Sequence, residues 1–128
     1  MKQPLATLLL ASLAISAQAQ QFPTKPIRFI VGFTAGSEVD VIGRMIAHEM
    51  GEKWGQRVVV DNRPGAGSTV AGAIVASANA DGYTLFFNSV SHAATPVLYP
   101  KAPFDTLRDF AGVTQATSLP NVLIIAPS

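Results

Sequence analysis

The chain has 128 residues, of which 48% are hydrophobic and only 13% are charged, and it contains no cysteine. Nine basic residues balance eight acidic ones without forming a basic stripe, which argues against a nucleic-acid partner. The lack of cysteine excludes disulfides, thiol catalysis, cysteine-ligated metals and a lipidated cysteine. The length suits one compact domain or one lobe of a larger protein.

The first residues have the pattern of an export signal. Lys2 and the terminal amino group give a positive start, and an apolar run covers Leu5–Ile15. That run is too short to cross a bilayer as a helix, and Ala17-Gln18-Ala19 offers the small residues that a signal peptidase reads. We therefore expect residues 1–19 to be a signal peptide cleaved near Ala19, and the exported protein to be periplasmic. A buried N-terminal helix is the alternative interpretation.

Further along the chain, β-branched apolar runs alternate with helical patterns. The predicted strands cover Ile27–Val31, Arg57–Val60, Tyr83–Phe87 and Asn121–Ala126. The predicted helices run from Asp40 to a stop at Gly55, over Val70–Ala80, and, interrupted by Pro96, over Ala93–Leu98. This alternation predicts an α/β fold with a mostly parallel sheet flanked by helices.

The first predicted helix shows its orientation through its apolar spacing. Four apolar residues at i, i+3, i+4 and i+8 are expected to face the core: Ile42, Met45, Ile46 and Met50. The opposite, polar face should carry Arg44, His48 and Glu52.

Two glycine-bearing loops, Val31–Asp40 and Asp61–Thr69, each connect a predicted strand to a predicted helix. Such turns leave backbone N–H groups uncovered at the helix start, which suits a carboxylate or a phosphate. Parallel strands would bring both loops, and the end of the third strand, to one edge of the sheet, where ligands of open α/β sheets bind. The candidate ligand-binding residues are Phe33, Ala35, Gly36, Ser37, Asp40, Arg63, Gly65, Ala66, Gly67, Asn88 and Ser89.

Each loop also has a purely structural interpretation. Ser37 and Asp40 have capping-box spacing, so the first loop is equally typical of a tight turn before a capped helix. Arg63 is able to pair with an anionic ligand, but a surface or interlobe contact would also explain it.

Other ligand classes and enzymatic activity find little support. The second loop places Val70 where G-x-G-x-x-G needs a small residue, and it lacks a Gly-Lys-Ser/Thr ending, so no nucleotide cofactor is predicted. His48 and His92 lie apart and no clustered ligands predict a metal site. We expect no enzyme, since no G-x-S-x-G elbow appears. The rival hypothesis is an exported α/β hydrolase-like enzyme that uses Ser89 or Ser91 with His92 and an aspartate.

Five short motifs, in this order and spacing, resemble the Bug-type extracytoplasmic receptors, the solute-binding proteins of tripartite tricarboxylate transporters. They are Phe22–Arg28, Asn62–Gly67, Asp81–Leu85, Leu98–Pro100 and Pro120–Leu123. The resemblance runs from the signal peptide to Ser128 and implies a two-lobed, Venus-flytrap periplasmic binding protein of the second type.

Members of that family bind small carboxylates or related polar metabolites between the lobes and deliver them to membrane transporter subunits. The resemblance implies that both glycine-bearing loops hold the ligand's carboxylate through backbone donors and ordered water. The sequence has no second apolar span and no cysteine for a lipid anchor, so no membrane insertion is expected once the signal is cleaved.

The chain departs from the family pattern in two ways. The usual first loop is F-x-P-G-G-x-x-D, whereas here Ser37 replaces a glycine and Glu38 adds an acid. A carboxylate at a helix N-terminus competes with an anionic ligand, so either Glu38 turns to solvent or the ligand is less anionic than usual. Family members are also considerably longer, so residues 20–128 are expected to be an incomplete first lobe. A non-functional fragment is the third hypothesis.

Overall fold

A computed structural model describes residues 21–118 of the protein. Its elements are β1 (Ile27–Val31), α2 (Glu38–Trp54), β2 (Val58–Asn62), the 3₁₀ turn η2 (Ala66–Ser68), α3 (Thr69–Ala76), β3 (Thr84–Phe87) and α4 (Ser91–Leu98). The predicted signal peptide and the predicted strand Asn121–Ala126 lie outside the described residues. Within residues 21–118, no helix is both long and apolar enough to cross a membrane.

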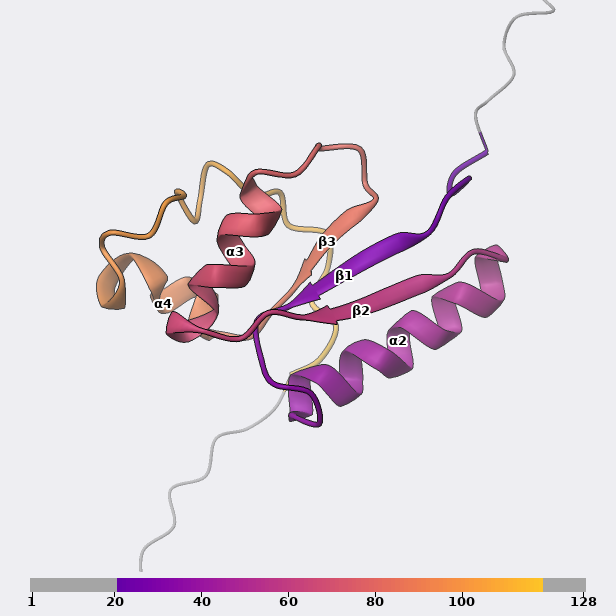
Figure 1. Ribbon diagram of the computed structural model, residues 1–128, viewed down its shortest axis with the longest axis horizontal. Coiled ribbons are helices and arrows are strands. Elements are labelled where there is room, and N and C mark those ends of the chain that lie inside the picture. Colours follow the sequence, from indigo (N-terminus) through magenta and orange to yellow (C-terminus); the bar gives the residue numbers. More distant parts are fainter. Residues whose placement is uncertain (1–20, 119–128) are drawn as a thin grey trace, which may run out of the picture.

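The three strands form one parallel sheet in the order β2-β1-β3. Helix α2 packs against β1 and β2 on one face of the sheet, and α3 packs against β1 and β3 on the other (Figure 1). The predicted fold class, α/β with a small parallel sheet flanked by helices, is therefore confirmed.

The main core lies between the sheet and α2. Phe29 of β1 stacks on Phe87 of β3 with ring centroids 5.8 Å apart, and Ala47 of α2 is buried with Phe29. A Cβ at Gly43 would lie 3.1 Å from Phe87 Cδ1, so the glycine lets the helix come close to the sheet. This close approach lets the Phe87 ring pack against α2, and an aromatic side chain buries a large apolar surface for one residue.

The sequence-based orientation of α2 was wrong at one position. Met45 is 65% exposed, and the buried residues of the helix are Asp40, Gly43 and Ala47. The small residues at positions 43 and 47 let the helix backbone approach the sheet, which turns the predicted apolar face partly outward. Met50 still packs against the core.

The other face of the sheet carries a second apolar group. Phe104 lies over Gly72 of α3, where a Cβ would be 2.6 Å from the ring atom Cζ. Phe104 also packs with His92 and Phe110, and Phe86 of β3 completes this aromatic cluster. The segment after α4 therefore returns to cover α3 and β3.

At the amino edge of the sheet, two of the family-like motifs contact each other. The Thr24 N–H donates to Tyr83 Oη at 2.9 Å, and Lys25 Nζ lies 4.3 Å above the Tyr83 ring while pairing with Asp81 at 3.2 Å. Phe22 packs on the same tyrosine, with centroids 4.9 Å apart. These motifs hold the entry to β1 against the entry to β3, far from the glycine-bearing loops.

The Phe29–Phe87 stack should dominate the stability of the α2 face. We expect Phe29→Ala to lower the free energy of unfolding by about 3–5 kcal/mol, because Phe29 is only 4% exposed and the truncation leaves a cavity. Val59→Ala, at a site 44% exposed on the next strand, should cost less than about 1 kcal/mol. Urea unfolding followed by circular dichroism measures both, and equal losses would contradict this core assignment.

Candidate ligand-binding site

The three loops that follow the strands lie at one edge of the sheet, as the parallel topology predicted. Val31, the last residue of β1, is in register with Asn62 of β2 and with Phe87 of β3, so the strands end at the same level. The first two loops are also joined directly, because Ser68 Oγ donates to the Gly32 carbonyl at 3.2 Å. A Cβ at Gly32 would collide with the Ser68 side chain, so this crossing requires glycine.

The first loop ends in a cap that resembles the predicted capping box but differs in one bond. Ser37 Oγ accepts the Asp40 N–H at 3.3 Å, as a cap should. The Asp40 carboxylate does not return to the Ser37 N–H. It accepts the N–H of Gly36 at 2.8 Å, while the Ser37 N–H donates to the Thr34 carbonyl at 3.2 Å. Gly36 has a φ of +83°, a conformation that glycine adopts without strain.

Asp40 is buried, and its carboxylate accepts three hydrogen bonds from described residues. Arg44 Nε donates to Oδ2 at 3.0 Å and Asn62 Nδ2 donates to Oδ1 at 2.9 Å, in addition to the Gly36 N–H. The hydrogen bond from Arg44, followed by that from Gly36, outweighs the effect of burial and lowers the pKa of Asp40 to about 2. Asp40 therefore supports the loop through these contacts.

Backbone donors are left over in the same loop. The N–H groups of Phe33, Thr34 and Ala35 donate to no acceptor among residues 21–118, and Thr34 and Ala35 are exposed. Glu38 is exposed, and its side chain makes no hydrogen bond or ion pair with any described residue. The two alternatives were that Glu38 turns to solvent or that the ligand is less anionic than usual. In the structure, Glu38 faces solvent. Thr34 was missing from the sequence-based set, because nothing in the sequence tells which amides of a loop stay unpaired.

The second loop is a left-handed turn. Four consecutive residues have positive φ: Gly65 (140°), Ala66 (45°), Gly67 (61°) and Ser68 (74°). Ala66 and Ser68 carry a Cβ, so each costs on the order of 1–3 kcal/mol of backbone strain that the surroundings must offset. The Tyr99 ring packs directly on this turn and helps to hold it, since a Cβ at Gly67 would lie 2.9 Å from Tyr99 Cζ. The turn presents Gly65, Ala66 and Gly67 at the surface.

Arg63 is engaged in a surface ion pair. Its Nε lies 2.9 Å from Asp61 Oδ1, and a second nitrogen lies 3.2 Å from Oδ2. Arg28 of β1 binds the same carboxylate, and its hydrogen bond is the main reason why the pKa of Asp61 lies below the usual value. The structural interpretation of Arg63 thus accounts for its position.

The third loop brings Asn88 and Ser89 to this edge, and both are half-buried. Ser89 Oγ accepts the Ser91 N–H at 3.3 Å and lies 3.1 Å from Ser91 Oγ, so it supports the start of α4. His92 packs edge-on against Phe110 at 4.8 Å, and burial lowers its pKa. Among residues 21–118, neither serine hydroxyl nor any carboxylate hydrogen-bonds to His92, so no catalytic triad is assembled there.

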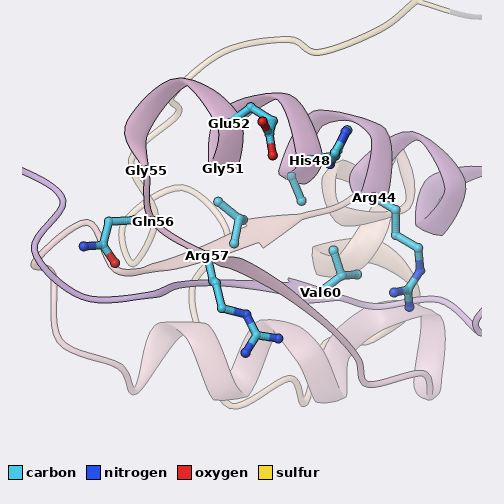
Figure 2. A pocket seen from close by; sticks show the side chains of 10 residues that line it. Arg44, His48, Gly51, Glu52, Gly55, Gln56, Arg57 and Val60 are labelled. Carbon is cyan, nitrogen blue, oxygen red and sulfur yellow. The ribbon is translucent and has the colours of Figure 1, made fainter.

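Two grooves are found besides the loops. One, of about 590 Å³, lies between α2 and β2, and Figure 2 shows Arg44 and His48 on α2 with Arg57 just before β2. The other, of about 610 Å³, is lined by residues from Thr95 to Asp109. No group of three or more His, Asp or Glu side chains that suits a metal ion occurs in the part of the chain that the structure describes.

The family model described as the tripartite tricarboxylate transporter family receptor matches residues 42–128. This chain belongs to that receptor family. A UPF0065 protein from the tcbD-tcbE intergenic region of Pseudomonas sp. (strain P51) is 40% identical over 127 residues, covering 97% of this chain and 38% of the relative. The family resemblance inferred from the five motifs is confirmed.

Solved structures of receptors in this group share the fold. The periplasmic binding protein BugD matches with a TM-score of 0.66 and 32% identity over 70% of this chain. MatC from Rhodopseudomonas palustris with bound malate matches with a TM-score of 0.62 and 34% identity over 70% of this chain. R. palustris Rpa4515 with adipate matches with a TM-score of 0.64 and 36% identity over 67% of this chain. The chain spans 30%, 31% and 29% of those three proteins, respectively.

The pairing of Asp40 should be visible in the acid dependence of stability. Its pKa in the folded protein is about 2 against 3.8 without the contacts, so the ionised form contributes about 2 kcal/mol that is present above pH 5 and lost as the pH falls toward 2. Asp40→Asn should lower the free energy of unfolding at pH 7 by at least that amount. The difference between the two proteins should shrink by about 2 kcal/mol between pH 5 and pH 2 in urea titrations. A constant difference would contradict the assigned pairing.

The contact between Gly67 and Tyr99 predicts a non-additive pair of substitutions. Gly67→Ala should lower the free energy of unfolding by at least about 2 kcal/mol, from the positive φ and from overlap with the ring. In a Tyr99→Ala background the overlap disappears, and the same change should cost only about 1–2 kcal/mol. A double-mutant cycle by thermal unfolding measures the coupling, and additive losses would show that the ring does not rest on Gly67.

Proposed function

We propose that this chain forms the first-lobe side of the ligand cleft of a periplasmic solute-binding receptor for a small carboxylate or a related polar metabolite. The observation that carries the proposal is the turn at Phe33–Ala35, whose three backbone N–H groups find no acceptor among residues 21–118, placed beside the exposed left-handed turn at Gly65–Gly67. Both lie at the edge of a parallel sheet where ligands of α/β proteins bind.

The chemistry of this edge suits a carboxylate. The free N–H groups lie just before α2, whose N-terminus carries a partial positive charge that favours an anion. We assign the ligand contacts, direct or through ordered water, to Phe33, Ala35, Gly36, Ser37, Gly65, Ala66, Gly67, Asn88 and Ser89, together with the Thr34 N–H. We assign no ligand contact to Asp40, which holds the first loop through the Gly36 N–H, or to Arg63, which pairs with Asp61 at the surface; both belong to the sequence-based set. MatC with malate and Rpa4515 with adipate support the class of ligand, since both compounds are dicarboxylates.

The remaining parts of the proposal follow from the family. The export pattern of residues 1–19 and the periplasmic character of BugD support a periplasmic location. The membership in the receptor family supports delivery of the ligand to a tripartite tricarboxylate transporter. The relatives are about three times as long as the matched region, which supports assigning the facing wall of the cleft to a second lobe.

Titration of the ¹⁵N-labelled chain with malate and with adipate tests the proposal by nuclear magnetic resonance. We expect concentration-dependent shifts of the Thr34, Ala35, Ala66 and Gly67 amides, weaker at high salt because the attraction is electrostatic. The amides around Asp81 at the opposite edge should stay unchanged, which provides an internal control.

The diamide of malate is the matched control compound, since it has the same skeleton without the charges. An equal response to the diamide would argue against recognition of a carboxylate. Shifts confined to the amino edge, or none with either acid, would contradict the proposed function.

A further inference from the structure

We propose that Asn62 is a positioning residue, one that orients the peptide between Phe33 and Thr34 so that the Thr34 N–H is presented to the ligand. That the Thr34 N–H binds a ligand rests on the proposed function, whereas the orientation of the peptide is a property of the free protein. Asn62 is the last residue of β2, and its side chain reaches across to the first loop. Its Nδ2 donates to the Phe33 carbonyl at 3.0 Å.

Peptide planarity converts this bond into an orientation. The Phe33 carbonyl and the Thr34 N–H belong to one planar, trans peptide unit and point in opposite directions. When Asn62 holds the carbonyl toward the protein, the N–H of Thr34 must point the other way; Thr34 is an exposed residue, and its N–H has no acceptor among residues 21–118. The next unit repeats the arrangement, because the Thr34 carbonyl accepts the Ser37 N–H at 3.2 Å and so turns the Ala35 N–H outward.

The side chain of Asn62 is itself held in one orientation. Its second N–H donates to Asp40 Oδ1 at 2.9 Å, and its carbonyl oxygen accepts from an Arg44 terminal nitrogen at 2.9 Å. A flipped amide would set its oxygen against the Asp40 carboxylate and against the Phe33 carbonyl, which are both acceptors. An amide at this position is therefore the side chain that satisfies all three neighbours, and neither an acid nor an apolar residue does so.

The test compares the wild-type chain with Asn62→Ala and with a matched control, Asn79→Ala, at an exposed asparagine after α3. Backbone ¹⁵N relaxation of the ligand-free proteins gives the order parameter of the Thr34 amide. We expect about 0.85 in the wild type and in the control, and less than about 0.6 in Asn62→Ala. Malate binding followed by amide shifts should weaken about tenfold in Asn62→Ala, as the loss of one well-placed donor implies, and should be unchanged in the control.

The relaxation measurement separates a positioning role from a merely structural one, since a general loss of stability lowers the melting temperature without loosening one amide of the folded state. A rigid Thr34 amide with unchanged malate affinity in Asn62→Ala would overturn the inference. Absence of any response of the wild type to malate and adipate would count against the proposed function alone, because the relaxation comparison still decides the role of Asn62. If Asn62→Ala does not fold, the near-isosteric Asn62→Leu replaces it: it fills the same space without placing a second charge beside Asp40, removes the donor to Phe33, and should loosen Thr34 equally.

Discussion

The buried carboxylate of Asp40 is the interaction on which the rest of this edge depends. A carboxylate removed from water is strongly destabilising unless charged or hydrogen-bonded partners replace the solvent. Here the partners come from three places: Arg44 one turn along α2, Asn62 at the end of β2, and the Gly36 N–H in the first loop. Because all three must be in place at once, the start of the helix, the end of the strand and the loop between them have fixed relative positions.

The small residues of the two loops serve mainly to allow close contact. Gly32 leaves room for Ser68, which ties the first loop to the second, and Gly67 leaves room for Tyr99. The resulting left-handed turn includes two residues other than glycine, Ala66 and Ser68, in a conformation that costs free energy. Strain of this kind persists where the surrounding contacts hold the backbone, and a preformed turn loses less entropy when it binds an anion.

The family-like motifs that lie within residues 21–118 divide between the two edges of the sheet. Those around Thr24 and Tyr83 join the starts of β1 and β3 and contribute to the scaffold. Those around Asn62 and Tyr99 shape the loops at the carboxyl edge. A motif shared by a family therefore does not by itself indicate contact with the ligand.

The sequence alone determined the alternation of strands and helices, the parallel sheet, the capping role of Ser37 and the meeting of three loops at one edge. These features follow from local periodicity and from the handedness of strand–helix–strand connections, which act over short stretches of chain. Only the tertiary structure decided that Met45 faces solvent, that the Asp40 carboxylate accepts the Gly36 N–H, that Arg63 pairs with Asp61, and that Asn62 donates to the Phe33 carbonyl. Each of those outcomes depends on how closely one element approaches another and on which hydrogen-bonding groups that approach leaves unpaired.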